Sequence, residues 1–118
     1  MAPHNAFGKL GEKLAANWLI EKGYEILHQN WRYSWYEIDI IAKKENTLHI
    51  IEVKVRKHSP FGFPEESVSK KKFRKLKKAT EEFLLRNPQY RWLEYGIVAI
   101  TFFTDREPEY LFFQDVYL

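Results

Sequence analysis

The spacing of apolar and polar residues along the chain predicts two helices. Residues 7–22 carry apolar side chains at three- and four-residue intervals, as amphipathic helices do, and Gly23 follows as a terminator. Gly8 and Gly11 cost helix stability, so they indicate either a close backbone approach or a frayed first turn. A second amphipathic helix is predicted over 68–86. The apolar faces consist of Phe7, Leu10, Leu14, Ala15, Trp18 and Leu19 in the first helix, and of Phe73, Leu76, Thr80, Phe83 and Leu84 in the second.

Five other apolar segments are predicted to be strands: 24–31, 36–44, 47–57, 94–103 and 110–118. The short turn at 45–46 makes the second and third strands an antiparallel hairpin. Residues 58–67 contain Pro, Gly and Ser and predict a loop. The connection through the second helix to the fourth strand is long enough for a parallel crossover. The expected fold is α/β, with a mixed central sheet flanked by helices in the order helix-strand-strand-strand-helix-strand-strand, and residues 1–118 form one domain.

Composition narrows the class of protein. Hydrophobic residues make up 45% of the 118, enough for a packed core. The absence of cysteine excludes disulfides, thiolate metal sites and cysteine nucleophiles. The first residues show no apolar signal core, and the longest apolar run, around 97–103, is too short to cross a bilayer. We therefore expect a cytoplasmic protein that does not contact membranes.

The positive charge is concentrated although the formal net charge is only +3. In residues 70–78 only Phe73 and Leu76 interrupt a run of lysine and arginine. Such a run suits a polyanionic partner, although a solvated helix face is the alternative. The expected phosphate-binding residues are Arg32, Arg56, Lys70, Lys71, Lys72, Arg74, Lys75 and Lys78.

The third predicted strand places a carboxylate and an ammonium group on one face. Alternate strand residues share a face, so Glu52 and Lys54 point together. If the hairpin closes through residues 45–46, position 52 lies opposite Asp39 on the second strand. Facing carboxylates repel each other unless a positive charge lies between them. Lys54 supplies part of that charge and a divalent cation would supply more, whereas an ordinary solvent-exposed Glu–Lys pair is the alternative.

This arrangement suits hydrolysis of a phosphodiester. Two carboxylates with free oxygens suit Mg²⁺ or Mn²⁺, which could lower the pKa of a bound water and stabilise charge on phosphate. A lysine beside the cation could position that water.

The motif pattern resembles a known superfamily. The "EID" at 37–39 and "EVK" at 52–54 resemble the core of PD-(D/E)XK nucleases, with Ile38 where that motif often has proline. Together with "GKLGEKLAANWLIEKGYEIL" near the N-terminus, "NWR" at 30–32 and "IIEVKVR" at 50–56, the chain resembles the YraN-type family of small bacterial proteins. That family is generally assigned the nuclease-like, restriction-endonuclease-like fold.

The resemblance implies roles for four residues: metal-binding acids, a motif lysine and a helical glutamate, namely Asp39 and Glu52, Lys54, and Glu12. A solvated helix carboxylate is the alternative for Glu12. Two positions depart from the family pattern, since Tyr36 replaces a glycine and Gly96 replaces an aspartate.

The expected function is that of a Mg²⁺-dependent endonuclease acting on DNA, in the manner of structure-selective junction resolvases. A non-catalytic nucleic-acid-binding module is the main alternative, and a protein-interaction adaptor is a third. A homodimer is possible. The aromatic residues Trp31, Tyr33, Trp35 and Tyr36 lie near the predicted site in sequence, where they could either stack on bases or pack in the fold.

Overall fold

The computed structural model describes residues 3–58 and 70–114, with the side chains of 3–7 and 70 left aside. Its elements are α1 (Pro3–Glu21), β1 (Glu25–Tyr33), β2 (Tyr36–Lys44), β3 (Thr47–Lys57), α2 (Lys70–Arg86), β4 (Trp92–Phe102) and β5 (Glu109–Gln114). The predicted order is confirmed, and both β2 and β3 begin and end where predicted. The predicted loop after residue 58, the predicted helical residues 68–69 and the end of the predicted fifth strand lie outside the described residues.

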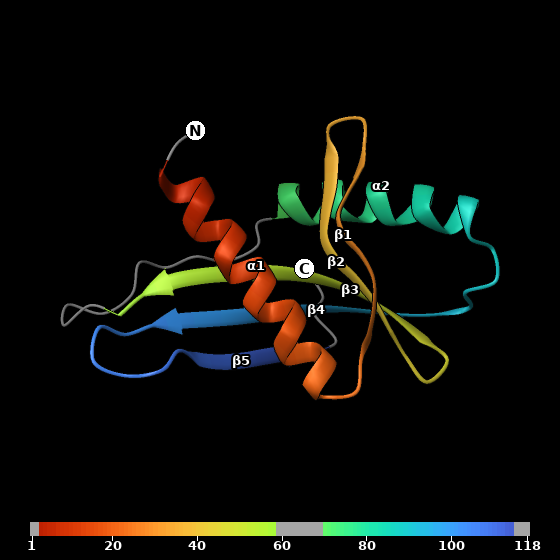
Figure 1. Cartoon of the computed structure of the whole chain (residues 1–118). Coiled ribbons are helices and arrows are strands. Elements are labelled where there is room, and N and C mark those ends of the chain that lie inside the picture. The colour runs from red at the N-terminus through yellow and green to blue at the C-terminus, as the bar shows by residue number, and fades with distance from the viewer. Residues whose placement is uncertain (1–2, 59–69, 115–118) are drawn as a thin grey trace.

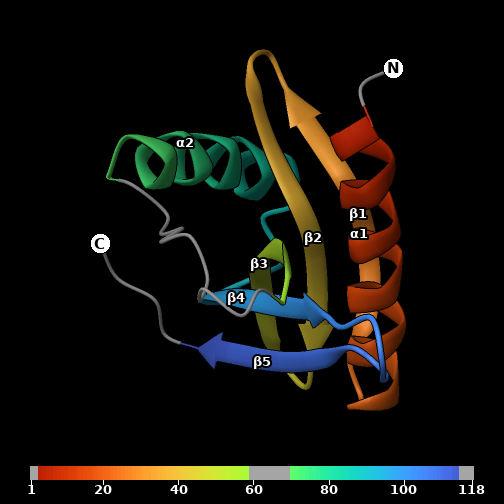
Figure 2. The same cartoon turned by 90° about the vertical axis from the view of Figure 1, so that its left-hand side faces the viewer.

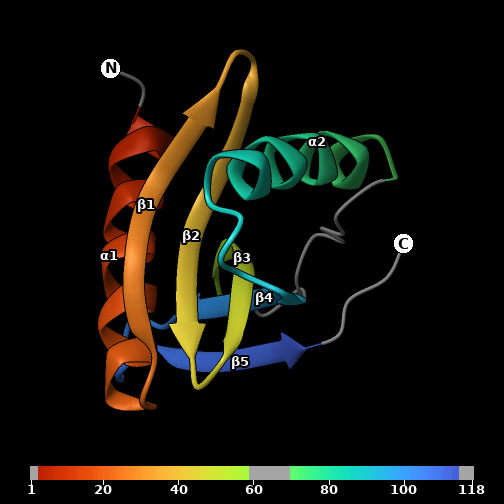
Figure 3. The same ribbon diagram turned by 90° about the vertical axis from the view of Figure 1, so that its right-hand side faces the viewer.

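The strands form one sheet in the order β1-β2-β3-β4-β5. All neighbours are antiparallel except β3 and β4, which pair in parallel through the α2 crossover. Figures 2 and 3 show α1 on one face of this open sheet and α2 on the other. The mixed α/β architecture expected from the sequence is therefore confirmed.

Each helix covers a separate apolar cluster. On the α1 face, Ala15 and Leu19 pack with buried sheet residues that include Ile40 and Ile51. On the α2 face, Phe83 and other helix residues pack with Ile41 and its neighbours. Leu10 departs from the predicted apolar face, because its side chain is 47% exposed. Within the described residues, no helix is long and apolar enough to span a membrane.

Glycines set the end of α1 and its distance from the sheet. Gly23 adopts a φ of 95°, and the N–H groups of Gly23 and Tyr24 donate to the carbonyls of Ile20 and Leu19, as in a Schellman motif. A Cβ at Gly11 would collide with the side chain of Val55 on β3, so this glycine permits a close approach of helix and sheet. A Cβ at Gly8 would meet no atom within 4 Å, so no close approach to the sheet requires glycine at position 8.

Strand β2 divides into two halves. The paired half (Ile40–Lys44) is bonded to β1 on one side and to β3 on the other, and its last pair with β3 is Ile40 with Ile51. The split half (Tyr36–Asp39) continues with β1 alone, forming a hairpin that rises beyond the rest of the sheet (Figure 1). Alternation along a strand predicts that Ile38 and Ile40 share a face, as Glu37 and Asp39 share the other. This prediction is wrong for the two isoleucines, because Ile38 packs in the α2 cluster and Ile40 in the α1 cluster. The switch of face lies at the point where β2 loses β3 as a neighbour.

Candidate metal and nucleic-acid site

Asp39 lies where β2 leaves β3. The backbone pairing of β2 with β3 ends at Ile40, next to Asp39. At Asp39 the contact with β3 is made by the side chain, because the N–H of Val53 donates to the Asp39 carboxylate with 2.8 Å between N and Oδ2. The Asp39 carboxylate also lies close to the buried carboxyl group of Glu52, where it favours the protonated form of Glu52 as a hydrogen-bond donor. The register that placed Asp39 near position 52 is thus observed, and the two predicted acids lie together.

The environment of Glu52 disfavours its ionised form. Burial is the main cause, followed by the charge of Asp39, and together they raise the pKa of Glu52 to about 8. The positive charges of Lys72 and Lys54 act in the opposite direction. Lys72 Nζ lies 3.8 Å from Glu52 Oε2 in an ion pair, which the sequence did not indicate. The pair of acids therefore carries a charge that its own surroundings only partly offset.

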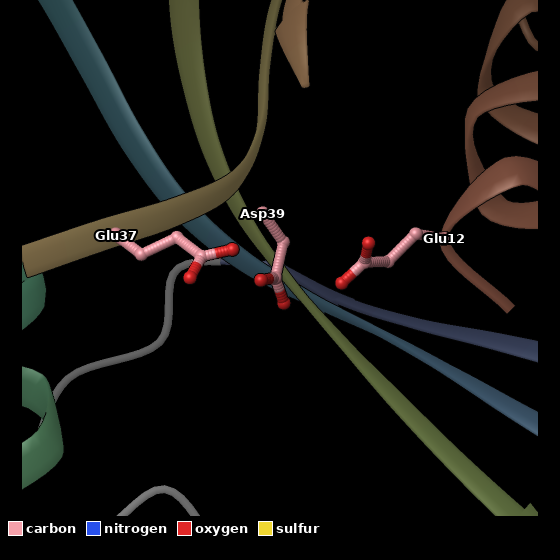
Figure 4. Close-up of side chains that lie close together, drawn as sticks. All are labelled: Glu12, Glu37 and Asp39. Atoms are coloured by element: carbon pink, nitrogen blue, oxygen red, sulfur yellow. The ribbon is translucent and has the colours of Figure 1, made fainter. Parts of the chain in front are cut away.

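Two further acids reach Asp39 from opposite sides. One carboxylate oxygen from each of Glu12, Glu37 and Asp39 lies within 4.8 Å of the other two. In Figure 4 Asp39 lies between Glu37, its neighbour on β2, and Glu12, which extends from α1. Burial, and then the charge of Asp39, raise the pKa of Glu12. The structure thus brings Glu12 to the predicted acids, and Asp39 belongs to this three-acid cluster while it also lies beside Glu52.

Asn30 connects the three-acid cluster to β1. Its two neighbours, Gln29 and Trp31, pair with the two neighbours of Asp39, so Asn30 faces Asp39 across the hairpin. The backbone of Asn30 is in the left-handed region, with a φ of 53°. With the amide nitrogen turned toward the acids, it donates to Glu37 Oε1 and Glu12 Oε1, each at 3.0 Å. Neither Asn30 nor Glu37 is among the site residues expected from the sequence. The available signals were the "NWR" motif for Asn30 and the shared strand face with Asp39 for Glu37.

A cavity of about 430 Å³ opens beside these acids. Glu37 and Glu52 contribute carboxylates to its wall, and α2 contributes Lys71, Lys72 and Lys75. Its remaining lining residues are Trp35, Tyr36 and Leu76. Acidic and basic groups from distant parts of the chain therefore meet around one space large enough for part of a nucleotide.

The other predicted phosphate-binding residues are placed differently. Arg32 pairs with Glu37 at 3.1 Å between Nη2 and Oε2, at the edge of the three-acid cluster. Arg74 and Lys78 are exposed on α2 and are not among the residues that line the cavity. Arg56 is half-buried at the far end of β3, and the side chain of Lys70 lies outside the described part. Only one face of the lysine-rich helix thus turns toward the acids.

The four aromatic residues of the hairpin also differ in their surroundings. Trp31 packs against Phe83 with 5.4 Å between ring centroids, and Tyr36 packs on the α2 cluster. Arg86 lies over the ring of Tyr33, 5.3 Å from its centroid. Trp35 is 92% exposed. Packing in the fold accounts for Trp31 and Tyr36 but not for Trp35.

Both departures from the family pattern have packing explanations. Tyr36 joins the α2 cluster and lines the cavity. A Cβ at Gly96 would lie 2.7 Å from the Phe112 ring, so a side chain at that position is incompatible with the present packing of β5. Neither Tyr36 nor Gly96 belongs to the group of acids around Asp39, so these two departures leave that group unchanged.

The fold and the site define an α/β protein with an open mixed sheet and an acidic cluster beside a lysine-lined cavity. A family model described as "Uncharacterised protein family UPF0102" matches residues 11–102. A UPF0102 protein of Phocaeicola vulgatus is 50% identical over 84 residues, which cover 71% of this chain and 69% of the relative. A UPF0102 protein of Flavobacterium psychrophilum is 44% identical over 100 residues, which cover 85% and 84% of the two chains. The chain belongs to the UPF0102 family, which confirms the YraN-type resemblance; the nuclease activity stays a prediction.

Proposed function

We propose that this protein is a Mg²⁺- or Mn²⁺-dependent nuclease that hydrolyses phosphodiester bonds in DNA. The observation that carries the proposal is the meeting of Asp39 with Glu52 and Glu12 beside a cavity walled by α2 lysines. Carboxylates alone would repel a polyanionic substrate, and lysines alone would bind it without chemistry. Their combination around one cavity favours a hydrolytic site for nucleic acid.

The residues fit a hard divalent cation. Glu12, Glu37 and Asp39 offer carboxylate oxygens within 4.8 Å of one another, the ligands that Mg²⁺ and Mn²⁺ prefer. Burial, and then the charge of Asp39, raise the pKa of both Glu12 and Glu52, and a cation would offset the negative charge that contributes to these shifts. When bound, such an ion would supply positive charge to a phosphate and lower the pKa of a water molecule.

Different residues of the chain would then bind the cation, orient the attacking water and hold the phosphates. Asp39 and Glu52 would hold the cation, while Asn30 keeps Glu12 oriented toward them. Lys54, whose charge already acts on Glu52, would orient the attacking water or stabilise the phosphate. Lys71 and Lys75 would hold the phosphates of the bound strand.

A cleavage screen tests the activity. Labelled duplex, single-stranded, flapped and four-way-junction substrates, in DNA and in RNA, are incubated with wild type and with Asp39→Asn in Mg²⁺ or Mn²⁺. We expect metal-dependent cleavage of at least one DNA substrate, reduced by about 10²–10³-fold in Asp39→Asn, which is the loss typical of removing a charge-stabilising group. Asp105→Asn, in the exposed turn before β5, is the matched control. Equal cleavage by Asp39→Asn and wild type would assign the activity to a contaminant or to another site.

A lysine substitution separates chemistry from binding. Lys54→Ala should abolish cleavage but leave nucleic-acid affinity nearly unchanged, because one lysine is a small part of a phosphate footprint. Affinity is measured with Ca²⁺ in place of Mg²⁺ to limit turnover. Parallel losses of affinity and cleavage would mean that Lys54 serves in binding only.

The salt dependence of binding tests the role of α2. Neutralising the cavity lysines in Lys71→Gln, Lys72→Gln, Lys75→Gln should lower the slope of log K against log salt by about three units, one for each lost phosphate contact. The control triple Arg74→Gln, Lys77→Gln, Lys78→Gln removes the same charge from the same helix away from the cavity. Equal slope changes in the two triples would show a diffuse charge effect without a defined binding face.

A non-catalytic nucleic-acid-binding module is the second candidate. The ion pair between Lys72 and Glu52 favours it, because this lysine offers the buried acid a partner without any cation. This candidate predicts salt-dependent binding by wild type without metal-dependent cleavage of any substrate in the screen. Absence of both binding and cleavage would favour a protein-interaction adaptor.

A further inference from the structure

Trp35 occupies the tip of the β1–β2 hairpin. The last strand pair is Tyr33 with Tyr36, so Ser34 and Trp35 form the turn, with Ser34 at a φ of 56°. Figures 1 and 2 show this tip extending beyond the rest of the sheet. The Trp35 side chain is 92% exposed, so its large apolar ring contributes almost nothing to the core.

The other tryptophans show how unusual that exposure is within this chain. Trp18 stacks on Tyr110 with 5.4 Å between ring centroids, and Trp31 packs against Phe83. Trp92 is also exposed, at 68%, but it lines a separate cavity with Lys43 and Arg91. Among the four, only Trp35 is both solvent-exposed and beside the acids of the candidate site.

The surroundings of Trp35 select the kind of ligand. It shares a cavity with the carboxylates of Glu37 and Glu52 and with three α2 lysines. A purely apolar partner would bury those charged groups without pairing them, at a large cost. A nucleotide instead offers a flat base for the indole and a phosphate for the lysines.

We infer that Trp35 stacks on an unpaired base of the substrate, next to the phosphate held at the candidate site. In an intact duplex the base faces are covered by their neighbours, whereas a single strand, a flap or a junction leaves a face free. The substrate class is therefore nucleic acid with at least one unstacked base beside the scissile phosphate. This inference rests on the proposed nuclease function and adds the reason for structure selectivity.

Binding of paired and branched substrates tests the stacking. Affinities are measured in Ca²⁺ for a fully paired duplex and for the same duplex with a single-stranded flap. Trp35→Ala should weaken binding of the flapped substrate by about tenfold or more, the effect of losing one base–aromatic stack, and should leave the paired duplex unchanged. Trp35→Phe should retain most of the affinity, and Trp92→Ala is the control for loss of an exposed indole elsewhere.

An abasic scan distinguishes stacking from a general effect on the hairpin. Replacing flap nucleotides one at a time by an abasic analogue keeps every phosphate but removes one base. At the stacked position, the abasic substrate should bind wild type and Trp35→Ala equally. If Trp35→Ala binds every flapped substrate as wild type does, while wild type still cleaves DNA, the stacking inference is wrong and the nuclease proposal stands. If wild type neither binds nor cleaves any nucleic acid, both are wrong.

Discussion

The two halves of β2 differ in sequence and in what they contribute, since the split half reads YEID and the paired half reads IIAKK. In the paired half, Ile40, Ile41 and Ala42 are fully buried, and the backbone is bonded on both sides. In the split half, Asp39 accepts a hydrogen bond from the β3 backbone and joins the acids around it. A strand that keeps both neighbours stabilises the sheet, whereas the same strand without one neighbour frees backbone donors and space for charged side chains.

The largest expected effect is on the stability provided by the paired half. Ile41→Ala should lower the free energy of unfolding by about 2–5 kcal/mol, because it removes buried methylene groups and leaves a cavity against α2. Urea denaturation gives the value. Ile20→Ala, at a 54% exposed position of α1, is the control and should change stability by less than about 1 kcal/mol. A similar loss in Asp39→Asn and in Ile41→Ala would remove the functional distinction between the halves.

Glu52 should make stability depend on pH. Its folded-state pKa of about 8 lies above the ordinary value of 4.5, so folding takes up a proton between these values and stability falls as pH rises through that range. Glu52→Gln cannot titrate, so wild type should lose about 2 kcal/mol or more relative to the variant between about pH 5 and about pH 8.5. Urea denaturation across this range, with Glu25→Gln as the exposed control, measures the difference. Parallel curves for wild type and Glu52→Gln would contradict a buried Glu52 whose charge is only partly compensated.

Glycine substitutions test the close approach of α1 to β3, beyond the point where β2 and β3 separate. Beyond its last pair with β2, β3 is crossed by α1, where Gly11 contacts Val55. Gly11→Ala should destabilise the fold by about 1–2 kcal/mol through overpacking and should move Glu12 away from Asp39. Gly8→Ala, in open space on the same helix, should stabilise it by about 0.5–1 kcal/mol. Thermal unfolding of both variants gives the signs, and two changes of the same sign would contradict the close approach.

The smallest expected effect is stabilisation by a divalent cation at the split half. With Mg²⁺ or Mn²⁺ near its dissociation constant, the gain is on the order of half a kcal/mol. It should be larger above pH 8 than at pH 6, because protons compete with the cation for Glu52. Calorimetric titration compares wild type with the Asp39→Ala, Glu52→Ala double variant. Equal heats for the two proteins would count against a cation site here.

The sequence by itself determined the elements, their order and the pairing of the paired half. Apolar periodicity and a two-residue turn are local properties, so they were sufficient to place β2 and β3 in register and Asp39 near Glu52. Local sequence patterns could not predict where Glu12 and the lysines lie relative to those acids, because their positions depend on where two helices cross the sheet.

Only the tertiary structure decided the composition of the site. Ile38 and Ile40 lie on different faces at the point where β2 separates from β3, which simple alternation could not predict. The fold also places Asn30 beside Glu12 and Glu37 of the three-acid cluster, and Trp35 is exposed at the hairpin tip. Strand periodicity describes a residue's neighbours within a sheet, but where a sheet opens, the neighbours come from distant segments and depend on the packing of the whole chain.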